Sequence, residues 1–119
     1  MDNIQVLFIV LNEVDYLNDI LEGFVDVGVS GATVLDSQGM ASFIVNNSNK
    51  SVPLFGYLKS MLEDSLPYNK TIFTVLENEA LVEKAVAVVQ DIVGEINSSN
   101  VGFMFTIPIG KTYPMKFKE

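Results

Sequence analysis

A polar stretch directly after an apolar, β-branched segment holds the side chains best suited to contact a ligand. Thr33 to Leu35 has the character of a half-buried strand, whereas the following residues are types that end strands and form turns. Because small domains usually place binding functions on loops, we expect this stretch to be the root of a ligand- or partner-sensing loop. An ordinary turn that leaves a strand is the alternative. The stretch consists of Asp36, Ser37, Gln38, Gly39 and Met40.

A second polar cluster lies close to the end of the chain. Exposed amides and hydroxyl groups in such a cluster could cradle an anion. The alternative is a plain turn between a helix and a strand. The cluster consists of Ser98, Ser99, Asn100 and Gly102.

Basic residues gather beyond the last apolar segment, at Lys111, Lys116 and Lys118. Their ammonium groups could reach a phosphate from a neighbouring subunit, although basic tails on acidic proteins are commonly solvated. Carboxylate pairs such as Glu77 with Glu79 lie around helix starts, where acidic residues are expected without a metal ion. We therefore predict no metal site and no catalytic residue.

The composition limits the class of protein. The chain has 119 residues, of which 49% are hydrophobic and 18% charged, as is typical of one folded domain over residues 1–119. Seven lysines, no arginine and 15 acidic residues give a net charge of −8, which repels phosphate backbones and argues against nucleic-acid binding. The absence of Cys and His excludes thiolate and imidazole metal ligands.

The N-terminal residues lack the features of a signal peptide. The longest apolar run, Val6 to Leu11, is far shorter than the ~20 residues that span a bilayer. We therefore expect a cytoplasmic protein without membrane insertion.

The first part of the chain predicts a strand, a helix and a second strand. Ile4 to Leu11 is short and almost continuously apolar, which favours a strand buried on both faces. Asn12 is a suitable N-cap for a helix over Glu13 to Val27, and Gly28 is a suitable C-terminal cap. The second strand lies within Gly31 to Met40. The apolar face of the helix is expected to hold Val14, Leu17, Ile20, Leu21, Phe24 and Val25.

A long excursion, from about residue 37 to residue 69, follows the second strand. Its polar cluster at residues 46–50 predicts a mobile tip. Beyond Pro53, apolar residues at helical spacing over residues 54–62 predict a short helix.

The last part of the chain repeats the strand, helix, strand order. Thr71 to Leu76 predicts a third strand, and Asn78 caps a helix that stops between Gly94 and Asn97. Phe103 to Ile107 predicts a fourth strand, which ends at Pro108. The apolar face of this helix is expected to hold Leu81, Ala85, Val88, Val89, Ile92 and Ile96.

This order predicts an α+β, ferredoxin-like β-α-β-β-α-β fold, in which an antiparallel sheet carries two helices on one face. The other face of the sheet would then meet water. The first, third and fourth strands are apolar at nearly every position, so an uncovered face would expose several large side chains. We conclude that other subunits cover it.

The arrangement resembles the PII-like signalling family, the trimeric relatives of nitrogen regulatory protein PII, over nearly the whole chain. The resemblance is carried by Gly31 to Met40, by Asn69 to Val75 in the third strand, and by Gly102 to Ile109 in the fourth. It implies a homotrimer with inward-facing sheets and a T-loop after the second strand. It also implies that small effectors, with nucleotides among the candidates, bind in the clefts between subunits.

The resemblance assigns site residues as well. It implies a T-loop base at Ser37 to Phe43, a phosphate-binding B-loop at Gly94 to Val101, and phosphate-holding cations beyond the last strand, where Lys111 lies. Phe43 stands where classical members have a nucleotide-contacting Gln, the B-loop segment has no Lys, and the chain has no Arg. Because Lys does not replace a bidentate Arg, these departures argue against a classical ATP and 2-oxoglutarate site.

We therefore predict a non-enzymatic regulatory protein. Its effector would shift the loop from about Asp36 to Asn69 between conformations, and the loop would engage or release a protein partner. The identity of the effector stays open. One alternative is a ligand-binding regulatory module like an ACT domain. Another is a small acylphosphatase-like hydrolase, which would need a cationic phosphate cradle.

Overall fold

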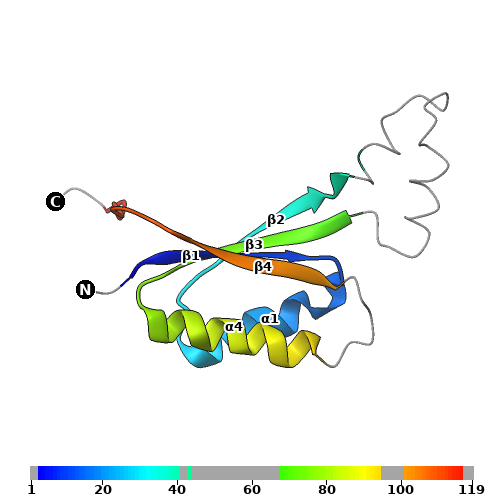
Figure 1. Ribbon diagram of the computed structural model, residues 1–119, viewed down its shortest axis with the longest axis horizontal. Helices are drawn as coiled ribbons and strands as arrows, with labels where there is room; N and C mark the ends of the chain where they lie inside the picture. The colour runs from blue at the N-terminus through cyan, green and yellow to red at the C-terminus, as the bar shows by residue number, and fades with distance from the viewer. Residues whose placement is uncertain (1–2, 41–42, 44–67, 95–100, 117–119) are drawn as a thin grey trace.

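In the computed structural model, a four-stranded sheet carries the helices α1 and α4 on one face (Figure 1). The structure describes residues 3–40, 43, 68–94 and 101–116. The strand order is β2-β3-β1-β4, and every neighbouring pair is antiparallel. This is the predicted ferredoxin-like arrangement. The elements are β1 (Gln5–Leu11), the 3₁₀ helix η1 (Val14–Tyr16), α1 (Leu17–Val27), β2 (Thr33–Gln38), β3 (Tyr68–Leu76), α4 (Glu79–Val93) and β4 (Gly102–Pro108).

The start of α4 and the end of α1 confirm two predicted caps. The Asn78 side-chain oxygen accepts a hydrogen bond from the Leu81 backbone N–H at 2.8 Å, so Asn78 is the N-cap of α4. Gly28 follows α1 with a φ of 99°, the left-handed conformation that favours glycine at this position.

The predicted role of Asn12 as a helix cap is wrong. Its backbone N–H donates to the Val101 carbonyl oxygen at 2.8 Å and so continues the pairing of β1 with the chain before β4. The following residues form η1, and α1 begins only at Leu17, not at Glu13.

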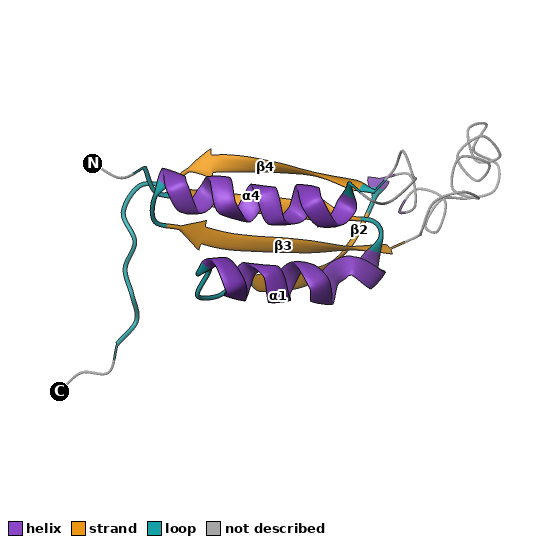
Figure 2. Ribbon diagram, turned by 90° about the horizontal axis from the view of Figure 1, so that it is seen from below, coloured by secondary structure: helices purple, strands orange, loops and turns teal. Residues whose placement is uncertain are grey.

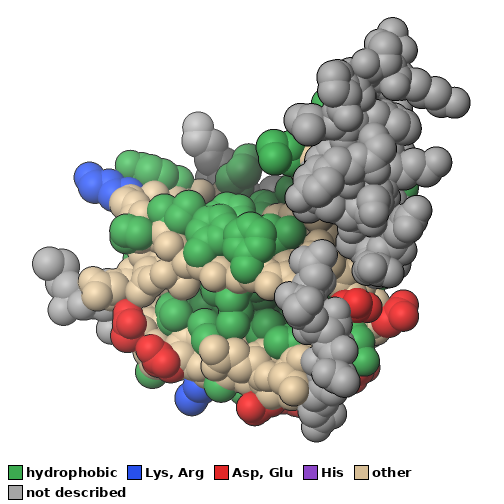
Figure 3. Space-filling view, turned by 45° about the vertical axis from the view of Figure 1, so that its right-hand side comes forward, with side chains coloured by type: hydrophobic (Ala, Val, Ile, Leu, Met, Phe, Trp, Pro, Cys, Tyr) green, Lys and Arg blue, Asp and Glu red, His purple; other side chains and the backbone are tan. Residues whose placement is uncertain are grey.

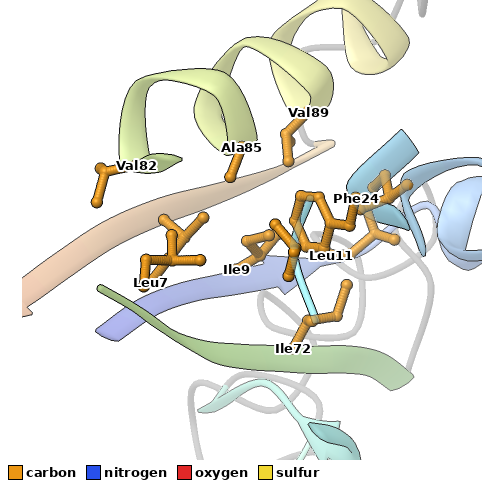
Figure 4. Packing of buried hydrophobic residues seen from close by; sticks show 11 residues of the cluster. Leu7, Ile9, Leu11, Phe24, Ile72, Val82, Ala85 and Val89 are labelled. Atoms are coloured by element: carbon orange, nitrogen blue, oxygen red, sulfur yellow. The ribbon is translucent and has the colours of Figure 1, made fainter. Parts of the chain in front are cut away.

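The core lies between the helices and the sheet (Figure 4). The β1 side chains that point toward the helices are Leu7, Ile9 and Leu11, each at most 2% exposed. Two details differ from the predicted helix faces. Val25 is 72% exposed, and the buried face of α4 includes a residue outside the predicted set, Val82. The other buried hydrophobic residues of this core are Ile20, Phe24, Val29, Ile72, Leu76, Ala85 and Val89.

The strands that flank the excursion are longer than predicted. Residues 36–38 belong to β2 and do not form a turn, because they pair with residues 68–70 of β3. The excursion is therefore residues 39–67. The predicted polar tip at 46–50 and the short helix at 54–62 lie outside the described residues, as does Ile96.

The second face of the sheet, which we call the open face, is apolar in its middle. It contains the β1, β3 and β4 side chains that alternate with those of the core, and the β2 side chains that pair with them. Several of these side chains are strongly exposed in the single chain, with Phe103 at 62%, Phe105 at 42% and Val75 at 49%. The open face consists of Val6, Phe8, Val10, Thr33, Leu35, Ser37, Asn69, Thr71, Phe73, Val75, Phe103, Phe105 and Ile107.

Candidate functional site

Four strand ends meet at one end of the sheet. Because the strands are antiparallel, the last residues of β1 and β2 lie beside the first residues of β3 and β4. The pairs Leu11 with Lys70 and Leu11 with Gly102 fix this register. In Figure 1, β2 ends and β3 begins at this same end of the sheet.

A hollow of about 420 Å³ crosses the sheet at this end, and we call it the loop-end hollow. Its volume falls in the range of roughly 300–1,000 Å³ that is usual for small-molecule sites. Residues from all four strands or their immediate ends form its walls. They are Val10, Asn12, Ser37, Gln38, Gly39, Asn69, Thr71, Gly102 and Phe103.

A chain of hydrogen bonds joins the polar side chains of the hollow. The Ser37 hydroxyl donates to the side-chain oxygen of Asn69 and lies 2.8 Å from the Thr71 hydroxyl. The Asn69 side-chain amide donates to the side-chain oxygen of Asn12 at 3.3 Å. Asn69 is only 8% exposed, so this network fixes the polar wall in place before any ligand arrives.

Aromatic side chains continue from the hollow into the middle of the open face. Phe8 stacks on Phe105 with a centroid separation of 5.2 Å and contacts Phe73 at 5.6 Å. Phe103, which lines the hollow, stacks on Phe105 at 6.0 Å. The open face is therefore polar at the loop end and aromatic beside it.

Charged side chains lie elsewhere on the described surface. Lys70, the basic residue of β3, pairs with Asp36 on the side of the sheet that faces the helices. Acidic side chains follow the helical layer, at the lower side of Figure 3, while hydrophobic side chains gather over the sheet above it. Among the described residues, no group of three acidic side chains is arranged to hold a metal ion.

Four of the predicted site residues, Ser37, Gln38, Gly39 and Gly102, line the loop-end hollow together. They come from segments more than 60 residues apart in the sequence. Met40 is 79% exposed and does not line the hollow.

The remaining predicted site residues are not part of this hollow as described. Ser98, Ser99 and Asn100 lie outside the described residues. Lys111 is exposed in the segment that follows β4, at the end of the sheet opposite the loop-end hollow. Figure 2 shows this segment running away from the sheet. Within one subunit, Lys111 and Ser37 are therefore far apart.

Sequence reasoning missed five contributors to the hollow, namely Val10, Asn12, Asn69, Thr71 and Phe103. Asn12 resembles a helix cap, and Asn69 and Thr71 resemble the end of a loop and the start of a strand. The position of these residues at strand ends could have revealed them, because antiparallel pairing brings a polar residue after β1 next to polar residues at the start of β3.

Comparison with solved structures identifies the fold. PII from Arabidopsis thaliana bound to citrate superposes with a TM-score of 0.61 and 13% identity, over 91% of this chain and 78% of that one. The B. subtilis GlnK–ATP complex gives a TM-score of 0.60 and 13% identity, over 91% of this chain and 84% of that one. A second B. subtilis GlnK structure superposes with a TM-score of 0.59 and 11% identity, over 90% of this chain and 85% of that one.

The fold is that of the PII proteins. The predicted resemblance is thus confirmed at the level of the fold. No protein-family model matches the sequence, and no curated protein matches it either. In a PII-like fold of this kind, the loop-end hollow lies at the root of the long excursion, where sequence reasoning expects the T-loop base. Within the described residues, no helix is long and apolar enough to cross a membrane.

Proposed function

We propose that this chain is a non-enzymatic regulatory protein of PII-like type. It assembles as a homotrimer, binds a small effector at the loop-end hollow, and contacts a protein partner through residues 39–67. The observation that carries the proposal is the position of the hollow, at the root of the excursion in a PII-like fold. A ligand there touches both ends of the excursion, through Gln38 and Asn69.

The open face supports the trimer. Its aromatic cluster of Phe8, Phe73, Phe103 and Phe105 would stay in contact with water in an isolated subunit. Large contiguous apolar patches on soluble chains are typical of interaction surfaces. Association of the open faces of three copies buries this cluster and brings the hollow to a subunit boundary.

The effector acts by population shift. A ligand changes the balance between two loop conformations only by the difference in its affinity for them. The hydrogen bonds between Ser37 and the two β3 residues Asn69 and Thr71 hold the two strands together at the excursion root. A ligand that binds these groups therefore favours the conformation in which the root is closed.

The hydrolase alternative is weaker. Phosphoryl and acyl-phosphate chemistry needs cations at the developing charge. The chain has no Arg, and none of the described residues that line the hollow is charged.

Sedimentation equilibrium at micromolar concentration tests the assembly. We expect a mass three times the 13.1 kDa of one chain. Phe105→Lys should yield monomers, because it places a charge in the aromatic cluster. Val25→Lys is the matched control, since Val25 is an exposed apolar residue on the helical side, and it should leave the trimer intact. A monomeric parent protein would contradict the proposal.

A further inference from the structure

We propose that Asn12 is a positioning residue that couples the excursion root to the start of β4. The excursion root consists of residues 36–38 of β2 and residues 68–70 of β3, which pair with each other. The inference rests on the proposed function for what acts on the root, because an effector in the loop-end hollow contacts it. The coupling itself is a property of the free chain.

Asn12 lies where the central strand ends. It follows β1, which runs between β3 and β4. On the β4 side, its backbone N–H donates to the Val101 carbonyl oxygen at 2.8 Å, so pairing continues one residue beyond Leu11. On the β3 side, strand pairing ends at Leu11 with Lys70, and the Asn12 side-chain oxygen accepts from the Asn69 amide at 3.3 Å. Asn12 is therefore held from both neighbouring strands.

Three hydrogen bonds form a relay across the four strand ends. The Ser37 hydroxyl of β2 donates to the side-chain oxygen of Asn69 in β3. The Asn69 amide donates to Asn12, and the Asn12 backbone N–H donates to Val101. Linked hydrogen bonds polarise one another, so a change in the first bond of the relay affects the next.

The relay has discrete arrangements because an Asn side chain has one acceptor oxygen and one NH₂ donor group. Asn69 uses its oxygen toward Ser37 and its NH₂ group toward Asn12. Asn69 is 8% exposed, so loss of the Ser37 proton from its oxygen costs free energy. If the Asn69 amide turned to donate to Ser37 instead, its oxygen would meet the oxygen of Asn12. The Asn12 side chain must then turn as well or lose this contact.

The relay connects ligand binding to assembly. Val101 directly precedes β4, which carries Phe103 and Phe105 of the open face. A change at the excursion root is therefore passed to the strand that supplies aromatic side chains to the proposed trimer contact. An effector that favours the closed root also fixes the start of β4.

Amide hydrogen exchange of the isotope-labelled full chain, followed by NMR, measures the coupling. The reporter is the protection factor of the N–H at position 12, divided by that of Ile9 in the middle of β1. Because Ile9 follows global unfolding, a general loss of stability cancels in this ratio. Ser37→Ala removes the first donor of the relay and should lower the ratio about two- to tenfold, as expected for weakening one hydrogen bond.

Control variants separate the relay from other effects. Ser30→Ala alters an exposed serine beyond the opposite end of β2 and should change the ratio less than about 1.5-fold. In an Asn12→Ala background, Ser37→Ala should likewise change it less than about 1.5-fold, because the link is already broken. Asn12→Asp keeps an acceptor oxygen and should restore the effect of Ser37→Ala. The side-chain amide resonances of Asn12 should shift in Ser37→Ala but not in Ser30→Ala, a readout that leaves Asn12 unaltered.

Three results would overturn the inference. One is an unchanged ratio in Ser37→Ala. Another is an equal effect of Ser37→Ala with and without the Asn12 side chain, which would mean that the β1 backbone carries the change. The third is the failure of Asn12→Asp to restore the effect. The exchange measurement uses no ligand, so a chain that binds no effector would contradict the proposed function and leave the relay intact.

Discussion

At the scale of single residues, Gly102 has the tightest steric requirement among the glycines that line the hollow. Its φ is 151°, a conformation that residues with a side chain rarely adopt. A Cβ atom at this position would overlap the carbonyl oxygen of Val10 in the neighbouring strand. Glycine therefore allows β4 to begin directly beside β1, which closes one wall of the loop-end hollow.

Gly102→Ala should lower the free energy of unfolding by about 2–4 kcal/mol, from backbone strain and steric overlap together. Urea denaturation followed by circular dichroism measures this. Gly110→Ala is the control, because Gly110 has no positive φ and no atom within 4 Å of its would-be Cβ. It should change stability by less than about 0.5 kcal/mol. Equal stability of the two variants would contradict this account of Gly102.

Residue types predicted local structure well where the hydrogen-bond partners of a residue lie within a few positions of it in the sequence. Asn78 and Gly28 cap helices as expected, because a cap needs only backbone groups within a few residues. Asn12 has the same cap-like character, but its backbone pairs with Val101 and its side chain with Asn69. Partners 57 or more residues away cannot be read from the local sequence.

At the scale of elements, α1 and α4 pack against each other at a glycine of α1. A Cβ at Gly23 would come 2.5 Å from a methyl group of Val88. Val88 is β-branched and stiff at χ1, so its side chain cannot easily turn away inside a helix. The two helices therefore pack at a distance that requires glycine at this position.

Gly23→Ala should destabilise the protein by about 1–2 kcal/mol, although alanine is the better helix former by about 1 kcal/mol. The steric cost arises from contact with Val88, so the effects of Gly23→Ala and Val88→Ala on the free energy of unfolding should not be additive. The double variant should be at least about 1 kcal/mol more stable than the sum of the single changes predicts. Thermal or urea unfolding of the four proteins completes the cycle, and additive effects would rule out this contact.

The helices and strands were largely predictable from the sequence, whereas the length of the edge strand β2 was not. Strands β1, β3 and β4 have runs of apolar residues, and α4 has a clear helical period. Residues 36–38 look like a turn because they are polar. They extend β2 because Asp36 pairs with Lys70 and Ser37 bonds to Asn69 and Thr71 across the strands. Such cross-strand pairs stabilise a polar strand end only once the register is known.

At the scale of the whole molecule, the two faces of the sheet have different roles. One face packs on the helices, and its hydrophobic β1 and β3 residues are almost fully buried. The open face holds a polar end, where the hollow lies, and an aromatic middle. The apolar composition of the strands predicted that both faces need cover, while the position of the polar end depended on strand pairing. Ligand binding and assembly thus share one surface, which couples them in the proposed trimer.

In the proposed trimer, assembly makes the stability of the protein depend on its concentration. If three folded subunits dissociate when they unfold, each tenfold rise in concentration stabilises each chain by about 0.9 kcal/mol by mass action. For a chain of 119 residues, this corresponds to a rise in Tm of about 3–4 °C. Differential scanning calorimetry over two decades of concentration measures the slope. Phe105→Lys should remove the concentration dependence and lower the Tm, whereas Val25→Lys should retain the slope. A parent protein whose Tm is independent of concentration would show that the open face is not buried by copies of this chain.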